Sequence, residues 1–135
     1  TIYCAFDQVF SPVYVADVVS GIINLINGDC SGVFHLCNPV AHSRLQILEQ
    51  MIVSLRKHEE IEPDVIPCEI NSLGLDARRP LNISMDPTKL INATGMEFIT
   101  LENICDKMAA GIFQPPQQTN RPGVGTPRYP QLPPV

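Results

Sequence analysis

The chain has 135 residues, a formal charge of −5 and 44% hydrophobic residues, a composition typical of a folded domain. The tail, 114–135, holds two of the nine Lys and Arg residues, so residues 1–113 carry seven cations and 14 acids, or 7 − 14 = −7. Such an acidic body is poorly suited to bind nucleic acid, and the most apolar charge-free stretch, Val18–Gly28, is too short to cross a bilayer. We therefore expect neither nucleic acid nor membrane as a partner.

The first third of the chain predicts strand, helix and strand in turn. Residues 1–6 are mostly bulky and apolar and predict a strand. Ser11-Pro12 precedes a helix that ends at Asn27-Gly28, where glycine takes the left-handed conformation easily. Its apolar positions have helical spacing: Val15, Val18, Val19, Ile22, Ile23 and Ile26. Residues 32–37 form an apolar run between Gly32 and Asn38-Pro39, which predicts a short buried strand.

A second helix begins at Ser43, because Ser43 and Gln46 fit a capping box, and it ends at Arg56-Lys57. Residues 65–70 predict a short strand that Pro67 confines to an edge, and 71–79 predict an irregular loop.

Two further helices are predicted. Asp86-Pro87 begins a short helix, with Asp86 as its N-cap, and Thr100 caps the last one. Residues 114–135 hold seven of the 13 prolines and show no hydrophobic period. We expect a folded body, 1–113, followed by a disordered, Pro-rich tail, 114–135.

The cysteines and histidines give no metal-binding pattern. The five cysteines, 4, 30, 37, 68 and 105, include no C-x-x-C pair, so we expect buried or half-buried thiols in a reducing, cytoplasmic setting. The histidines, 35, 42 and 58, have no metal-ligand spacing, and we expect His35 to pack in a half-buried strand. Asp17 fits a solvated or capping residue better than a functional acid. We expect no metal site.

Arg78 and Arg79 are the strongest candidates for binding. They precede Pro80, which stiffens the loop, and Lys89 lies close in sequence. A guanidinium group can hold phosphate oxygens in a bidentate geometry, so these residues indicate a local anion site. The alternative is a surface ion pair with some of the many carboxylates.

Three separated motifs resemble those of the dTDP-4-dehydrorhamnose reductases, which are extended short-chain dehydrogenases. They are Asp7-Gln8…Ser11-Pro12…Asp17-Val18, then 32–36, and Ala77-Arg78-Arg79-Pro80-Leu81-Asn82…Met85-Asp86…Lys89-Leu90. The resemblance implies an α/β fold, the C-terminal substrate-binding portion of an extended Rossmann-type reductase, with the N-terminal cofactor half missing. Phe10 and Val13 depart from the glycine and threonine that are usual around Ser-Pro.

The family implies NADPH as cofactor of the intact enzyme and a dTDP-sugar nucleotide as ligand. Catalysis in the family depends on a Tyr-x-x-x-Lys pair, which this chain lacks, as it lacks a glycine-rich loop; we expect no catalytic residue here and no cofactor bound by this chain alone. By position in related epimerases, Arg79 would contact the pyrophosphate. Asn82 would make a nearby polar contact, and Arg78 would reach the same phosphate or pair with an acid.

A second resemblance leads to another function. The regulatory beta subunit of methionine adenosyltransferase has a similar R-P-x-N-x-x-x-D-x-x-K-L run and binds a protein partner. This resemblance implies a non-catalytic interaction subunit. The complete run of residues is closer to the reductase motif than to that of the beta subunit; it reads Ala77-Arg78-Arg79-Pro80-Leu81-Asn82.

Overall fold

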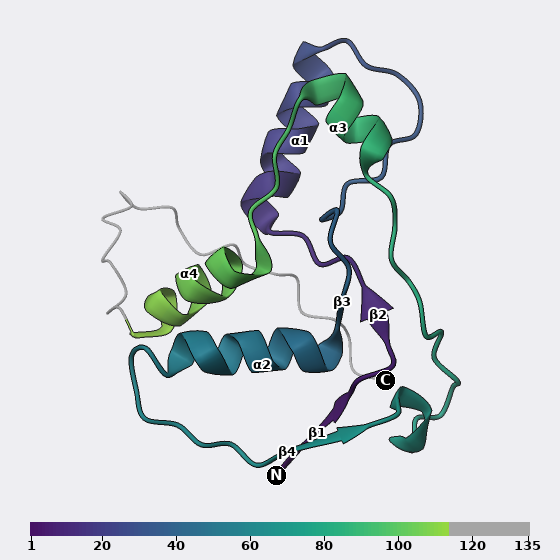
Figure 1. Ribbon diagram of the computed structural model, residues 1–135. Coiled ribbons are helices and arrows are strands. Elements are labelled where there is room, and N and C mark those ends of the chain that lie inside the picture. Colours follow the sequence, from purple (N-terminus) through teal and green to yellow (C-terminus); the bar gives the residue numbers. More distant parts are fainter. Residues whose placement is uncertain (114–135) are drawn as a thin grey trace, which may run out of the picture.

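The computed structural model describes residues 1–113, and the predicted tail lies outside them. Its elements follow one another as β1 (Ile2–Ala5), β2 (Val9–Phe10), α1 (Val15–Asn27), β3 (His42–Ser43), α2 (Arg44–Leu55), β4 (Val65–Cys68), the 3-10 turn η1 (Ile70–Ser72), α3 (Thr88–Thr94) and α4 (Leu101–Phe113) (Figure 1). The mixture of helices and short strands confirms the predicted α/β class.

Two small strand pairs connect distant parts of the sequence. β1 pairs in parallel with β4, with Ile2 opposite Val65, and β2 pairs antiparallel with β3, with Val9 opposite Ser43. Val9 also forms a parallel bridge with Asn82. These pairs confirm the predicted strands at the start of the chain and around Pro67, which lies in a two-stranded sheet where every strand is an edge.

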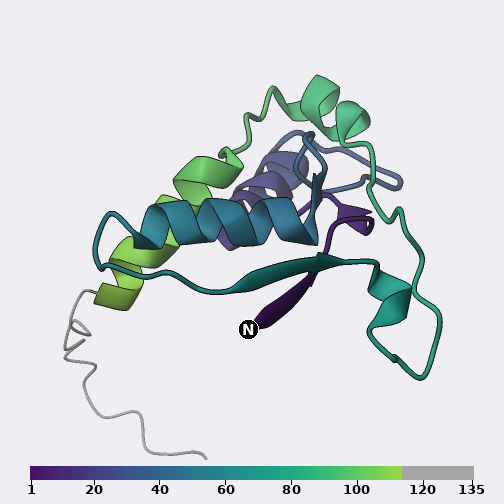
Figure 2. The same cartoon turned by 60° about the horizontal axis from the view of Figure 1, so that its bottom comes forward.

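The helices pack in two groups. α2 lies along α4 and over β1, whereas α1 lies beside α3 (Figures 1 and 2). The buried apolar residues are spread thinly across both groups: Ala5, Cys37, Ile70, Leu90, Met96, Cys105 and Ala109. Gly21 allows the close approach of α1 to its neighbours, since a Cβ there would lie 2.8 Å from Leu36 Cδ1.

The predicted helix caps are confirmed at α2 and α4. Ser43 Oγ accepts a hydrogen bond from Gln46 N at 3.1 Å, and Gln46 Oε1 accepts one from Ser43 N at 2.8 Å. Thr100 Oγ1 accepts from Asn103 N at 3.3 Å.

The predicted cap of α3 is shifted by one residue. Pro87 is the N-cap, and Asp86 lies before it. The Asp86 carboxylate still accepts a hydrogen bond from Thr88 N at 2.9 Å, and the Thr88 hydroxyl that also donates to it lowers the pKa of Asp86.

The predicted strand at 32–37 is wrong. The segment is irregular, and Val33 is 78% exposed. A strand needs a neighbour for its backbone groups, and none of the described strands pairs with this segment. The carbonyl of Val33 instead accepts a hydrogen bond from Lys89 Nζ at 2.8 Å. His35 is therefore exposed, and not half-buried in a strand.

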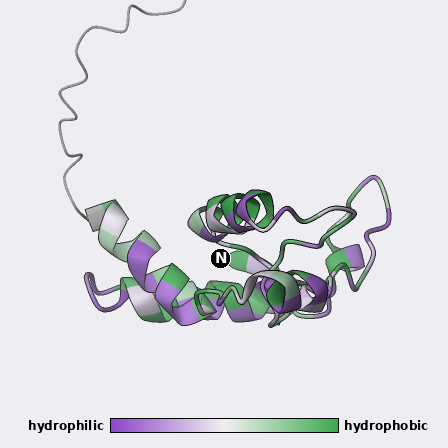
Figure 3. Ribbon diagram, turned by 90° about the horizontal axis from the view of Figure 1, so that it is seen from above, coloured by the Kyte–Doolittle hydropathy of each residue, from purple (hydrophilic) through white to green (hydrophobic). Residues whose placement is uncertain are grey.

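The apolar stripe of α1 faces outward. Val15 is 70% exposed and Ile26 is 72% exposed, and Val19, Ile22 and Ile23 are about half exposed. Figure 3 shows green, apolar positions on the helices of the described chain. The periodicity thus predicted the helix correctly, but within residues 1–113 nothing covers its apolar side.

Replacing Ser43 with Ala should lower the free energy of unfolding by about 1 kcal/mol, because alanine has no hydroxyl oxygen to accept the hydrogen bond from Gln46 N. Chemical denaturation measures this loss. Ser20→Ala, on exposed α1, is the control and should change stability by less than about 0.5 kcal/mol. Equal stability of Ser43→Ala and the wild type would contradict a stabilising role of the cap.

Candidate functional site

A cavity of about 600 Å³ lies between the first strand, the start of α2 and the loop that follows η1. Its walls combine two cations, one buried amide and an apolar surface. The lining residues are Tyr3, Ala5, Gln8, Arg44, Ile70, Leu73, Leu75, Arg79, Pro80 and Ile83. This composition suits a ligand with one anionic end and one less polar end.

The backbone of Arg79 is fixed by its neighbour Asn71. Asn71 Oδ1 accepts a hydrogen bond from Arg79 N at 2.9 Å, and Asn71 Nδ2 donates to Arg79 O at 3.5 Å. Asp7 holds the 3-10 turn that carries Asn71, because Asp7 Oδ1 accepts a hydrogen bond from Ile70 N at 2.8 Å. The arginine backbone is therefore positioned by a chain of side-chain to backbone bonds, although the loop itself is exposed.

The segment after Arg79 runs beside β2. Val9 N donates to Leu81 O at 2.7 Å, and Ile83 N donates to Val9 O at 3.0 Å. Gln8 Nε2 donates to Pro80 O at 2.9 Å. The sequence motifs around Asp7-Gln8 and around Arg79 thus meet in space, although about 70 residues separate them.

Arg44 is the second cation of the cavity, and no sequence motif singled it out. It is the first residue of α2, its Nε donates to Gln8 Oε1, and its guanidinium lies 5.6 Å from the centre of the Phe10 ring. Among residues 1–113 neither Arg44 nor Arg79 forms an ion pair, so no direct acidic partner neutralises them.

The structure separates the other basic and polar candidates from this cavity. Arg78 is exposed and is not among the lining residues. Asn82 Oδ1 accepts from Ser84 N at 2.9 Å, so its amide oxygen serves a local turn. Lys89 donates to Val33 O and lies 4.2 Å from the centre of the Phe34 ring, away from the arginines. The cations that cluster in sequence do not all cluster in space.

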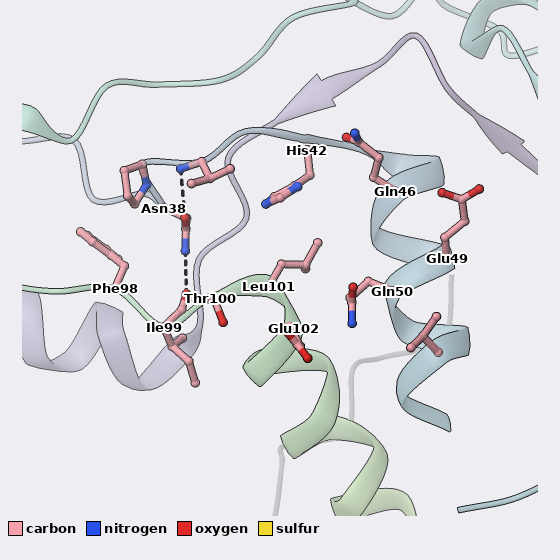
Figure 4. A pocket seen from close by; sticks show the side chains of 13 residues that line it. Asn38, His42, Gln46, Glu49, Gln50, Phe98, Ile99, Thr100, Leu101 and Glu102 are labelled. Atoms are coloured by element: carbon pink, nitrogen blue, oxygen red, sulfur yellow. Dashed lines mark hydrogen bonds between the residues drawn. The ribbon is translucent and has the colours of Figure 1, made fainter. Parts of the chain in front are cut away.

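A second hollow, of about 550 Å³, lies between α2, the start of α4 and the loop at 38–40 (Figure 4). Two acids, Glu49 and Glu102, line it, which disfavours an anionic ligand. Both ends of the buried Asn38 amide at its rim have protein partners, since its Nδ2 donates to Ile99 O at 2.8 Å and its Oδ1 accepts from Val40 N at 3.0 Å (Figure 4). We therefore regard this hollow as a packing seam between helices.

Asp17 is half-buried and is not the cap of α1, whose N-cap is Tyr14. Its Oδ2 accepts a hydrogen bond from Ile99 N at 3.1 Å, which ties α1 to the segment before α4. Its position therefore indicates a structural role.

Three of the thiols are not activated for chemistry. All five cysteines are free, and Cys37 and Cys105 are buried, as the sequence led us to expect. Burial raises the pKa of the Cys4, Cys37 and Cys105 thiols, which makes them poor nucleophiles near neutral pH. In the described part of the chain no three His, Cys, Asp or Glu residues gather in a way that could hold a metal ion.

Comparison with known proteins assigns the family. Residues 1–111 match the model of the RmlD substrate binding domain. The chain belongs to this family. No curated protein matches the sequence closely enough to be counted as a relative.

The fold of this RmlD substrate binding domain has a solved counterpart. A dTDP-4-dehydrorhamnose reductase from Bacillus anthracis, solved in complex with NADP, superposes with a TM-score of 0.68 at 24% identity over 82% of this chain. The match covers 38% of that reductase, so the chain spans well under half of its length. The likeness confirms the predicted fold. No helix within residues 1–113 has the length and apolar character that crossing a membrane requires.

Proposed function

We propose that this chain is the nucleotide-sugar-binding part of an NADPH-dependent dTDP-4-dehydrorhamnose reductase-like protein. Its ligand is a dTDP-linked 4-keto deoxysugar, and the cavity beside Arg79 receives the pyrophosphate. Arg78 and Asn82, which do not line that cavity, are secondary candidates for contacts with the ligand. The RmlD substrate binding domain family, which covers residues 1–111, supports this reading.

One observation carries the proposal. Arg79 lines a cavity whose other cation is Arg44, and no acid of the described chain pairs with either. Residues 1–113 carry a net charge of −7, so two arginines without an acidic partner at one cavity are a local exception. Such groups bind phosphate through charge-assisted, bidentate hydrogen bonds.

In this proposal the chain's own residues bind and orient the ligand, and the cofactor is held elsewhere in the intact family enzyme. The sequence contains no Tyr-x-x-x-Lys pair, and its single G-x-G, Gly123–Gly125, lies outside the described residues. NADPH supplies the hydride in the intact family enzyme. A group that protonates the 4-keto oxygen must lie within hydrogen-bond reach of it, and the family's pair for this task is absent here.

Replacing Arg79 with Ala should weaken dTDP binding about 10- to 150-fold, since hydrogen bonds to charged groups contribute roughly 1.5–3 kcal/mol. Arg79→Lys should recover part of this loss, because it restores the charge but not the planar fork. Calorimetric titration of the three proteins with dTDP measures the effect. Equal affinity of wild type and Arg79→Ala, with both folded, would contradict a phosphate-binding role.

The 135-residue chain alone should not oxidise NADPH in the presence of a 4-keto sugar nucleotide. The reason is the missing acid–base pair, not a lack of affinity for the sugar nucleotide. Absorbance at the NADPH band, with a protein-free control, measures this rate. Turnover above that control would show that the chain contains catalytic groups other than a Tyr-x-x-x-Lys pair.

The alternative is a non-catalytic interaction subunit resembling the beta subunit of methionine adenosyltransferase. The exposed apolar stripe of α1, Val15, Val19, Ile22, Ile23 and Ile26, favours it, since exposed apolar patches of this kind mark protein contacts. In this reading the chain binds the catalytic subunit of that enzyme.

Under the alternative, Ile23→Asp should weaken binding to a purified methionine adenosyltransferase catalytic subunit at least about tenfold, because a charge would be buried in the contact. Asn24→Asp adds the same charge at the adjacent exposed position and is the matched control. Interferometry with the immobilised chain measures both affinities. The absence of any binding by the wild type would exclude this partner.

A further inference from the structure

Gln8 is the buried centre of the cation cavity. Its side chain is 2% exposed, its Nε2 donates to Pro80 O at 2.9 Å, and its Oε1 accepts from Arg44 Nε. A buried amide keeps its hydrogen-bond partners, because leaving either end unpaired is costly. Gln8 therefore fixes two things at once: the side chain of Arg44 and the backbone next to Arg79.

One nitrogen of the Arg44 guanidinium is held by Gln8, and the two terminal nitrogens are available to a ligand. Its Nε is engaged by Gln8, and the group lies over the Phe10 ring at 5.6 Å from the ring centre. Its terminal nitrogens make no ion pair with the described residues. An arginine restrained in this way loses little freedom when it binds an anion.

We infer that Arg44 is the second phosphate-binding residue of this site, and that Gln8 positions Arg44 and the Arg79 loop to grip the two phosphates of a nucleoside diphosphate. This inference rests on the proposed function, whose own test concerns Arg79 alone. Arg44 begins α2 and Arg79 lies in the loop after η1, so the two arginines line the cavity from different elements.

Two separate forks should discriminate diphosphates from monophosphates. A diphosphate can engage both guanidinium groups, whereas a monophosphate satisfies one of them. Without Arg44 only the Arg79 guanidinium remains, and the second phosphate of the ligand adds little to the affinity. The ratio of dTDP to dTMP affinity therefore reports on the second cation, whichever phosphate it contacts.

The test is calorimetric titration of the 135-residue chain with dTDP and with dTMP. The wild type should prefer dTDP by about tenfold or more. Arg44→Ala should reduce this preference to about twofold or less. Arg56→Ala, a charge removal at the other end of α2, should keep the wild-type ratio. Gln8→Met preserves the side-chain volume but removes both hydrogen bonds of the Gln8 amide group. It should also reduce the preference for dTDP over dTMP, although both arginines remain.

The outcomes separate the two hypotheses. If the wild type binds no dTDP, the proposed function fails and the inference fails with it. If Arg79→Ala weakens dTDP binding but Arg44→Ala keeps the wild-type ratio, the inference is overturned and the proposed function stands. Circular dichroism establishes that each variant is folded. If Gln8→Met unfolds, the exposed Arg44→Ala variant still decides the matter.

Discussion

The candidate site depends on one buried amide. Gln8 joins the start of α2 to the loop that carries Arg79, through one donated and one accepted hydrogen bond. Glutamine suits this position because it offers a donor and an acceptor on one rigid group and carries no charge that burial would penalise. The neighbouring residues Asp7 and Val9 add hydrogen bonds to Ile70, Leu81 and Ile83, so a three-residue segment connects several parts of the cavity wall.

A second set of contacts joins the other two motifs of the sequence. Cys37 Sγ donates to Met85 O at 3.3 Å, and Lys89 reaches both the carbonyl of Val33 and the ring of Phe34. These contacts hold the irregular segment at 32–37 against α3 without strand pairing. They also explain why Lys89 is absent from the anion site: its ammonium group already has a carbonyl and an aromatic face as partners.

The family and the site bear on different questions. Membership of the RmlD substrate binding domain family follows from a match along residues 1–111, and it gives the class of ligand to test. The arrangement of Gln8, Arg44 and Arg79 follows from the structure alone and gives a reason for phosphate binding that does not depend on the family. The exposed stripe of α1 belongs to a third question, that of protein contacts, and lies on the other group of helices.

The sequence by itself determined the four helices, the strands at 2–5 and 65–68, and the capping box, because helix period, caps and turn residues act over a few neighbouring positions. It also singled out Arg79 through its neighbours in the chain. Only the tertiary structure decided that 32–37 is not a strand, that the apolar side of α1 faces outward, and that Arg44 joins Arg79 while Lys89 does not. Strand pairing, burial and the meeting of charges depend on partners far away in the sequence, and no local pattern specifies those partners.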